Sequence, residues 1–301
     1  MKCKKMITGF LLLVLVFGLT GCETAGRSTG FQGSGKLSIV TSIYPVYDFA
    51  KHIAGDKAEI VNLVPAGVEP HDFELSTGDM QLLEKADLFF YNGAGMENFV
   101  DKTLAAISNR NLVVVEAAVK VDKLESDHRV DPHTWLSVEN AILECQTIME
   151  ALIGLDQANQ EYYEQNFEEY TKQLRALQDR YQKELSECSG DTIVVAHEAF
   201  GYLCDEFGLK QEAVEGLTAD SEPDSARLKE IIDFCREHEI KVIFFEELVS
   251  PKVAQTIADE VGADTDVLNP VEGLTSEQEA EGLDYLGLME QNLEALKHAL
   301  K

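Results

Sequence analysis

The sequence predicts two Rossmann-like α/β lobes with mostly parallel sheets, joined by one long rigid α-helix. Short apolar runs alternate with helical patterns from residue 36 to about residue 152. A helical pattern without interruption follows, and the strand–helix alternation starts again near residue 190. The length of 301 residues is enough for two domains of ordinary size, so the fold class also agrees with the chain length.

The first lobe is expected over residues 36–152. Its strands are short apolar runs, and its helices show apolar side chains at helical spacing. The expected strands are 37–43, 59–63, 88–91 and 112–115, and the expected helices are 46–54, 76–85 and 138–153. Ser76 is expected to be the N-cap of the second helix.

The connecting helix is expected within residues 153–189. Residues 156–187 contain neither Gly nor Pro, and apolar or aromatic side chains recur every three or four positions at Tyr163, Phe167, Tyr170, Leu174, Leu177, Tyr181 and Leu185. At 1.5 Å per residue this helix would span roughly 48 Å, which is long enough to run along both lobes. A coiled-coil dimer is the alternative, but a tyrosine-rich seam of about four heptads disfavours it, so we expect a monomer.

The second lobe is expected over residues 190–301. The same alternation of apolar runs and helical spacing defines its elements. The expected strands are 192–196 and 242–245, and the expected helices are 199–207, 223–238, 251–261 and 276–300.

Residues 1–21 predict a signal peptide of the lipoprotein type. Three lysines precede an apolar stretch that is short for a membrane span of about 20 residues. The stretch ends at Leu19-Thr20-Gly21-Cys22, which resembles a bacterial lipobox, in which the cysteine is acylated. We therefore expect a lipid on Cys22 that anchors the chain to the outer side of the cell membrane, with residues 22–35 as a flexible tether. A plain signal peptide with a chance cysteine is the alternative.

The charge of the chain is strongly negative. The sequence has 25 Lys and Arg against 54 Asp and Glu, a net charge of −29. Such a surface repels phosphate backbones, so nucleic acid is not an expected partner, and it attracts cations. Cys145, Cys188, Cys204 and Cys235 could form disulfides or remain buried thiols, and without a CxxC motif they do not predict a cysteine zinc site.

Three of the seven histidines lie in loops or at strand ends, at His71, His133 and His197. Ligands of parallel α/β sheets bind beyond the carboxyl ends of strands, and converging imidazoles suit a tetrahedral zinc ion. The three residues are far apart in sequence, so no local motif supports the site. The helical patterns of His52, His238 and His298 and the polar loop around His128 predict structural or solvated roles for the other four.

Four motifs resemble the zinc-binding solute-binding lipoproteins of bacterial ABC metal importers, a family that also includes manganese binders once called adhesins. They are Ser42-Ile43-Tyr44-Pro45, the segment 67–74 (GVEPHDFE), the segment 131–136 (DPHTWL) and Phe244-Phe245-Glu246-Glu247. The resemblance implies one metal ion between the lobes, held by His71 and His133 from the first and His197 from the second. Manganese members tend to have a carboxylate at the third position, so an imidazole there favours zinc.

The resemblance leaves the fourth ligand open. Asn269 stands where many relatives have aspartate, and its neutral amide is a poor zinc ligand. Glu272 matches the glutamate ligand of a zinc-specific branch, and we expect it to complete the site. Asn269 as an outer-shell group, or a water, is the alternative.

The expected function is that of an extracytoplasmic receptor that delivers Zn²⁺ to the permease and ATPase of an ABC importer. The alternatives are a manganese receptor of the same family and a surface adhesin without a transport role. An enzyme is not expected, because no Walker A motif is present. His197-Glu198 also fails the H-E-x-x-H pattern of zinc proteases at Gly201.

Overall fold

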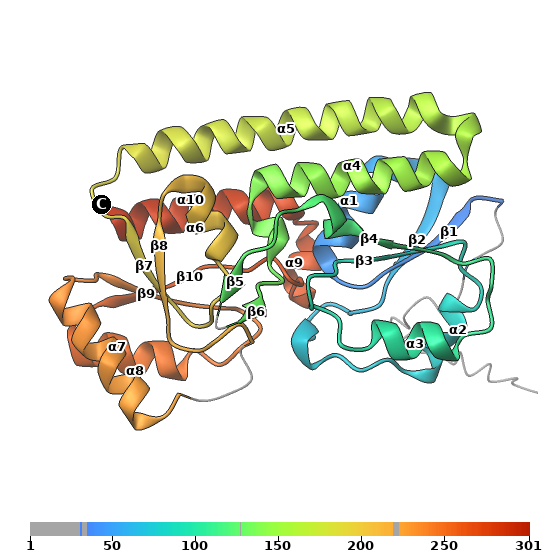
Figure 1. Cartoon of the computed structure of the whole chain (residues 1–301). Helices are drawn as coiled ribbons and strands as arrows, with labels where there is room; N and C mark the ends of the chain where they lie inside the picture. Colours follow the sequence, from blue (N-terminus) through green and yellow to red (C-terminus); the bar gives the residue numbers. More distant parts are fainter. Residues whose placement is uncertain (1–30, 32–34, 127, 219–222) are drawn as a thin grey trace, which may run out of the picture.

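The computed structural model describes residue 31 and residues 35–126, 128–218 and 223–301. The expected signal peptide, the acylated Cys22 and most of the tether lie outside the described residues. Two α/β lobes lie side by side, and one long helix crosses above both of them (Figure 1). The predicted fold class of two lobes with a long helix is therefore confirmed.

The first lobe contains a four-stranded sheet in the order β2-β1-β3-β4, and all its neighbouring strands are parallel. The strands are β1 (Leu37–Thr41), β2 (Ala58–Asn62), β3 (Leu88–Tyr91) and β4 (Val113–Glu116). The helices are α1 (Tyr44–Ala54), α2 (Thr77–Leu83) and α3 (Val100–Ala106), with short 3-10 turns η1 (Gly55–Lys57), η2 (Pro70–Asp72), η3 (Ala117–Lys120) and η4 (Thr134–Leu136). Ser76 caps α2 as expected, in a reciprocal capping box with Asp79.

Helices α4 (Val138–Leu155) and α5 (Gln160–Ser186) run antiparallel to one another along the top of the molecule (Figure 1). The predicted start of the long helix at Asp156 is wrong, because η5 (Gln157–Asn159) separates the two helices. The 27 residues of α5 span about 40 Å. Its tyrosines face the protein itself, since the hydroxyls of Tyr163, Tyr170 and Tyr181 donate to Asp156, Asp48 and the carbonyl of Met289.

The second lobe has the same architecture, with a parallel sheet in the order β10-β9-β7-β8. Its strands are β7 (Thr192–Val195), β8 (Lys210–Ala213), β9 (Val242–Phe245) and β10 (Asp264–Val267). Its helices are α6 (Gly201–Phe207), α7 (Ser225–Glu237), α8 (Lys252–Val261), α9 (Ser276–Glu281) and α10 (Tyr285–Leu300). In both lobes the sheet lies between a layer of helices on the α5 side and a pair of helices on the opposite side (Figure 1).

The predicted single helix over 276–300 is wrong, because Gly282 adopts a left-handed φ of 73° and ends α9. Sequence patterns also missed α3, β8 and β10, and an antiparallel hairpin of β5 (Glu125–Ser126) and β6 (Arg129–Val130). The edge strands β8 and β10 carry polar residues at most positions, which explains why apolar runs did not reveal them.

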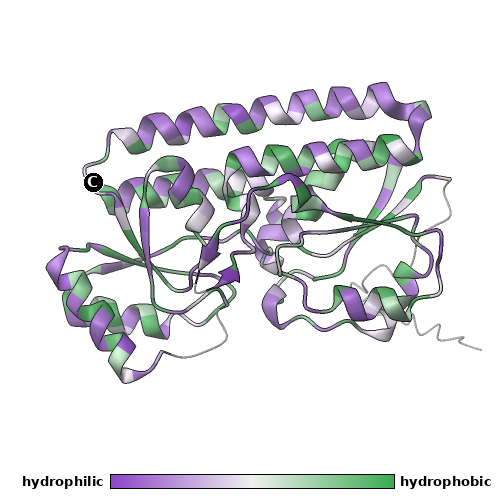
Figure 2. Cartoon of the chain, viewed as in Figure 1, coloured by the Kyte–Doolittle hydropathy of each residue, from purple (hydrophilic) through white to green (hydrophobic). Residues whose placement is uncertain are grey.

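One hydrophobic core underlies both lobes on the α5 side. Alternate residues of the inner strands point into it, while the residues between them enter a separate small core in each lobe. The sheets and α4 are rich in hydrophobic residues, whereas α5 is largely hydrophilic on its outer surface (Figure 2). Cys145, Cys188, Cys204 and Cys235 are free thiols in the structure; three are buried, and Cys188 is partly exposed. Within the described part of the chain, no helix is long and apolar enough to span a membrane.

Candidate metal centre

The candidate site lies between the lobes, where strands of both sheets end. His71 lies in η2 after β2, and His133 directly precedes η4. His197 follows β7, and Glu272 lies in the segment after β10. One ligand atom from each of the four residues falls within 4.8 Å of all the others. The structure therefore brings together the three imidazoles and the carboxylate that the sequence singled out.

The four ligand atoms face a common point. Nε2 of His133 is 3.3 Å from Nε2 of both His71 and His197. Oε1 of Glu272 is 2.9 Å from Nε2 of His133 and 3.5 Å from Nε2 of the other two. Tetrahedral zinc with bonds of about 2.0–2.1 Å has ligand atoms about 3.3 Å apart. The spacing in this cluster is thus close to that of a four-coordinate zinc ion.

Two carboxylates orient two of the imidazoles. Asp131 accepts from Nδ1 of His133 at 2.8 Å and from the backbone N–H of the same residue at 2.9 Å. Glu246 accepts from Nδ1 of His197 at 2.6 Å. Because a carboxylate only accepts, each Nδ1 carries a proton, and Nε2 is the ring nitrogen that faces the cluster. Sequence patterns did not identify these two carboxylates, although both lie inside the quoted motifs.

Burial of the cluster shifts the pKa values of its ionisable side chains. His133, His197 and Glu272 are at most 1% exposed, and neither oxygen of Glu272 receives a well-directed hydrogen bond. Burial alone would lower the pKa of His133, but the hydrogen bond to Asp131 and the charge of Glu272 raise it to about 9. Burial likewise opposes the charge of His197, yet the adjacent Glu246 holds its pKa well above the usual range. The three imidazoles hold the pKa of Glu272 well below its usual value despite burial.

The segment before Glu272 is strained. Val271 has a φ of 58°, a left-handed conformation that β-branched residues rarely adopt. The strain is maintained by Asn269, whose Oδ1 accepts from the N–H of Val271 at 2.7 Å, and by Trp135, whose indole N–H donates to the carbonyl of Pro270 at 2.8 Å. Such outliers concentrate at functional sites, and this one directly precedes the carboxylate of the cluster.

The remaining candidates lie outside the cluster. Asn269 donates its side-chain amide to Glu247, so both ends of its side chain are occupied by structural contacts. His52 stacks on Tyr170, and His238 packs on Phe234 at the end of α7. The exposed His298 pairs with Asp266, and His128 is exposed at the tip of the β5–β6 hairpin.

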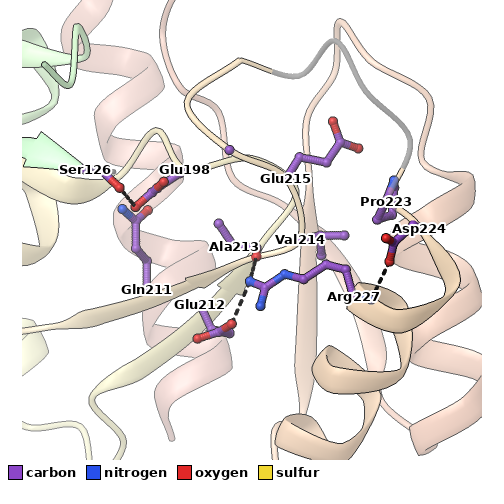
Figure 3. Close-up of a pocket in the computed structure, with 11 residues that line it drawn as sticks. Ser126, Glu198, Gln211, Glu212, Ala213, Val214, Glu215, Pro223, Asp224 and Arg227 are labelled. Carbon is purple, nitrogen blue, oxygen red and sulfur yellow. Dashed lines mark hydrogen bonds and ion pairs between the residues drawn. The ribbon is translucent and has the colours of Figure 1, made fainter. Parts of the chain in front are cut away.

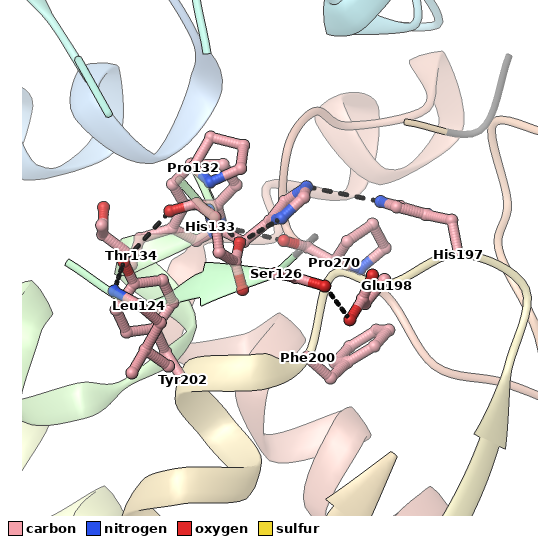
Figure 4. Close-up of polar contacts among 12 residues, drawn as sticks. Leu124, Ser126, Pro132, His133, Thr134, His197, Glu198, Phe200, Tyr202 and Pro270 are labelled. Carbon is pink, nitrogen blue, oxygen red and sulfur yellow. Dashed lines mark hydrogen bonds and ion pairs between the residues drawn. The ribbon is translucent and has the colours of Figure 1, made fainter. Parts of the chain in front are cut away.

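The hairpin joins the lobes beside the cluster (Figure 4). Oγ of Ser126 donates to Glu198, the neighbour of His197, at 2.7 Å. The hydroxyl of Tyr202 in α6 donates to the carbonyl of Asp131 at 3.0 Å. A Cβ at Gly201 would lie 2.6 Å from Oδ2 of Asp131, so only glycine allows this close approach of the lobes.

Two α/β lobes that meet around a buried set of three imidazoles and one carboxylate define a bilobal protein suited to binding a small cation. Residues 39–299 match the family model described as "Zinc-uptake complex component A periplasmic". Because this match covers most of the chain, the chain belongs to the family of periplasmic zinc-uptake component A proteins.

Named relatives agree with this assignment. The chain is 38% identical to the high-affinity zinc uptake system protein ZnuA of Bacillus subtilis, covering 98% of this chain and 96% of that protein. It is also 38% identical to the zinc-binding lipoprotein AdcA of Streptococcus pneumoniae over 88% of this chain, but it spans only 56% of that longer protein.

Solved structures show the same fold. The Zn(II)-bound ZnuA-like domain of Streptococcus pneumoniae AdcA superposes with a TM-score of 0.80 at 39% identity, covering 88% of this chain and 99% of that domain. The metal-dependent lipoprotein YcdH of Bacillus subtilis gives a TM-score of 0.80 at 41% identity, covering 88% of this chain and all of that one.

Proposed function

We propose that this chain is the extracytoplasmic receptor of an ABC-type zinc importer, and that it binds one Zn²⁺ through His71, His133, His197 and Glu272. The observation that best supports this proposal is the buried carboxylate of Glu272. It faces the Nε2 atoms of the three histidines, and neither of its oxygens receives a well-directed hydrogen bond. A buried carboxylate that receives no well-directed hydrogen bond is costly, and a cation at the common point would compensate all four groups at once.

The donor set favours zinc over manganese. Imidazole nitrogen suits zinc, whereas manganese prefers oxygen ligands and usually six of them. Four donors spaced for a tetrahedron leave the larger coordination number of manganese unsatisfied. The names of the relatives, which are zinc uptake and zinc-binding proteins, agree with this choice.

Delivery completes the proposed role. A lipid on Cys22 would hold the receptor at the membrane, residues 22–35 would act as its tether, and the monomeric chain would pass zinc to a permease driven by its ATPase. The role requires no chemical conversion of the ion. The negative surface of the chain supports it, because a net charge of −29 raises the local concentration of divalent cations.

The test is a zinc titration in competition with a chromophoric chelator. The wild-type chain should bind one tight zinc per chain, and His133→Ala should lose tight binding because it removes the central imidazole of the cluster. His128→Ala is the matched control, since that exposed histidine lies outside the cluster. A His133→Ala chain that still holds one tight zinc would refute the site, and tighter binding of manganese than of zinc would refute the proposed cargo.

A further inference from the structure

A cavity of about 650 Å³ opens beside the candidate metal centre, between the lobes. Its wall includes His71, Pro132 and Arg129 from the first lobe and Leu217 from the second. Of the four proposed ligands, His71 is the only one that is more than 1% exposed, with 7% of its side chain accessible. The cavity is therefore the side from which solvent meets the cluster, and its volume suits a small molecule.

The described wall of this cavity has a charge opposite to that of the chain. Among the described residues, its wall contains no carboxylate but includes the cations Lys123 and Arg129. Four other cavities each have two or more carboxylates in their described walls. The largest of these is lined by Glu198, Glu212, Glu215 and Asp224 (Figure 3).

The two cations differ in how they are held. Lys123 donates to the carbonyl of Ala118 and lies 3.7 Å from Oε1 of Glu116, so its charge is partly compensated. No carboxylate among the described residues forms an ion pair with Arg129. Its guanidinium lies against Gly216 of the second lobe, where a Cβ would meet Nη2 at 3.3 Å. Arg129 thus places a positive charge, without an ion-pair partner among the described residues, at the boundary of the lobes.

A positive charge at this opening repels a bare Zn²⁺ ion, but it attracts a zinc complex whose ligand is an anion. An arginine guanidinium matches the planar geometry of a carboxylate and binds it through two parallel hydrogen bonds. Asn98 adds a polar side chain to the same wall. These groups are complementary to a small molecule that carries several carboxylates.

We propose that this cavity is a subsite for a small polycarboxylate that carries zinc, and that Arg129 binds a carboxylate of the carrier while the ion moves to the cluster. This inference rests on the proposed zinc-receptor function. In the transfer, Zn–O bonds to the carrier break and bonds to the four ligands of the cluster form. Protons held by the imidazoles leave to solvent, and the free carrier dissociates.

The experiment compares the rates at which the mature chain takes zinc from zinc citrate and from aquo zinc, measured by stopped-flow fluorescence of Trp135. Arg129→Gln should slow transfer from zinc citrate about tenfold while leaving uptake of aquo zinc equal or faster. Arg175→Gln is the matched control, because Arg175 is exposed on α5 and far from the cavity wall, and it should change neither rate.

Each outcome decides the inference. Equal slowing of both zinc sources by Arg129→Gln, or no slowing of either, would overturn the subsite. Inorganic phosphate that competes as strongly as free citrate would show unselective attraction of anions and would overturn the polycarboxylate assignment. The equilibrium affinity of the wild-type chain for zinc is measured separately. Tight zinc binding without any effect of Arg129→Gln refutes this subsite alone, whereas absence of zinc binding refutes the proposed function.

Discussion

Zinc affinity should depend steeply on pH between about pH 7 and pH 9, where histidines with an ordinary pKa are already deprotonated. Zn²⁺ must displace the proton on Nε2 of His133, whose pKa is raised to about 9. With that pKa, lowering the pH from 8 to 7 weakens the apparent affinity about ninefold, whereas an ordinary pKa of about 6.5 gives only about 1.3-fold. The sign follows from competition: protons occupy the site below pH 9, so affinity rises with pH until that value.

The assay is a chelator competition at pH 6, 7, 8 and 9, together with calorimetry in buffers of different ionisation enthalpy to count released protons. Asp131→Asn is the informative variant, because loss of the carboxylate lowers the pKa of His133 and should flatten the change between pH 7 and 8. A wild-type affinity that changes less than twofold in that interval, without proton release, would refute the electrostatic reasoning.

Three further predictions concern the same region. Glu272→Gln should lower zinc affinity at least 100-fold, which a chelator titration would measure. Asn269→Ala should keep one zinc per chain and destabilise the fold by about 1–3 kcal/mol, because the hydrogen bonds of its side chain to Glu247 and to the N–H of Val271 are lost; chelator and unfolding titrations check this. Gly201→Ala should displace Asp131 and reduce zinc affinity about tenfold, and an unchanged affinity would contradict the proposed orienting role of that carboxylate. Zinc at 100 times its dissociation constant should stabilise the chain by about 2.7 kcal/mol, which calorimetry would detect as a rise in the melting temperature.

The sequence predicted the inner strands well because they are buried on both faces. The runs at Leu88–Tyr91 and Val242–Phe245 are continuously apolar, and the structure contains both with the predicted bounds. The edge strands β8 and β10 escaped prediction for the opposite reason, as the polar run Lys210–Ala213 shows. The final helix was predicted too long because the apolar spacing continues across Gly282, whose left-handed conformation is not evident from periodicity.

The candidate site was predictable only in part. Loop position and the family motifs pointed to the three histidines and Glu272, and their meeting in space depends on how the sheets align. The orienting partners Asp131 and Glu246 are defined by hydrogen bonds to individual imidazoles, which no sequence period encodes. The strained Val271 was also invisible, because valine ordinarily indicates extended backbone.

The hydrophobic core beneath α5 determines how the two lobes unfold. Phe49 of α1 packs edge-on against Tyr285 of α10 with ring centroids 5.0 Å apart, and the hydroxyl of Tyr285 donates to the carbonyl of Trp135. Side chains of both halves thus share a single hydrophobic core. Neither half can lose its structure without exposing apolar surface of the other, so the two should melt together in one cooperative transition, with equal calorimetric and van't Hoff enthalpies.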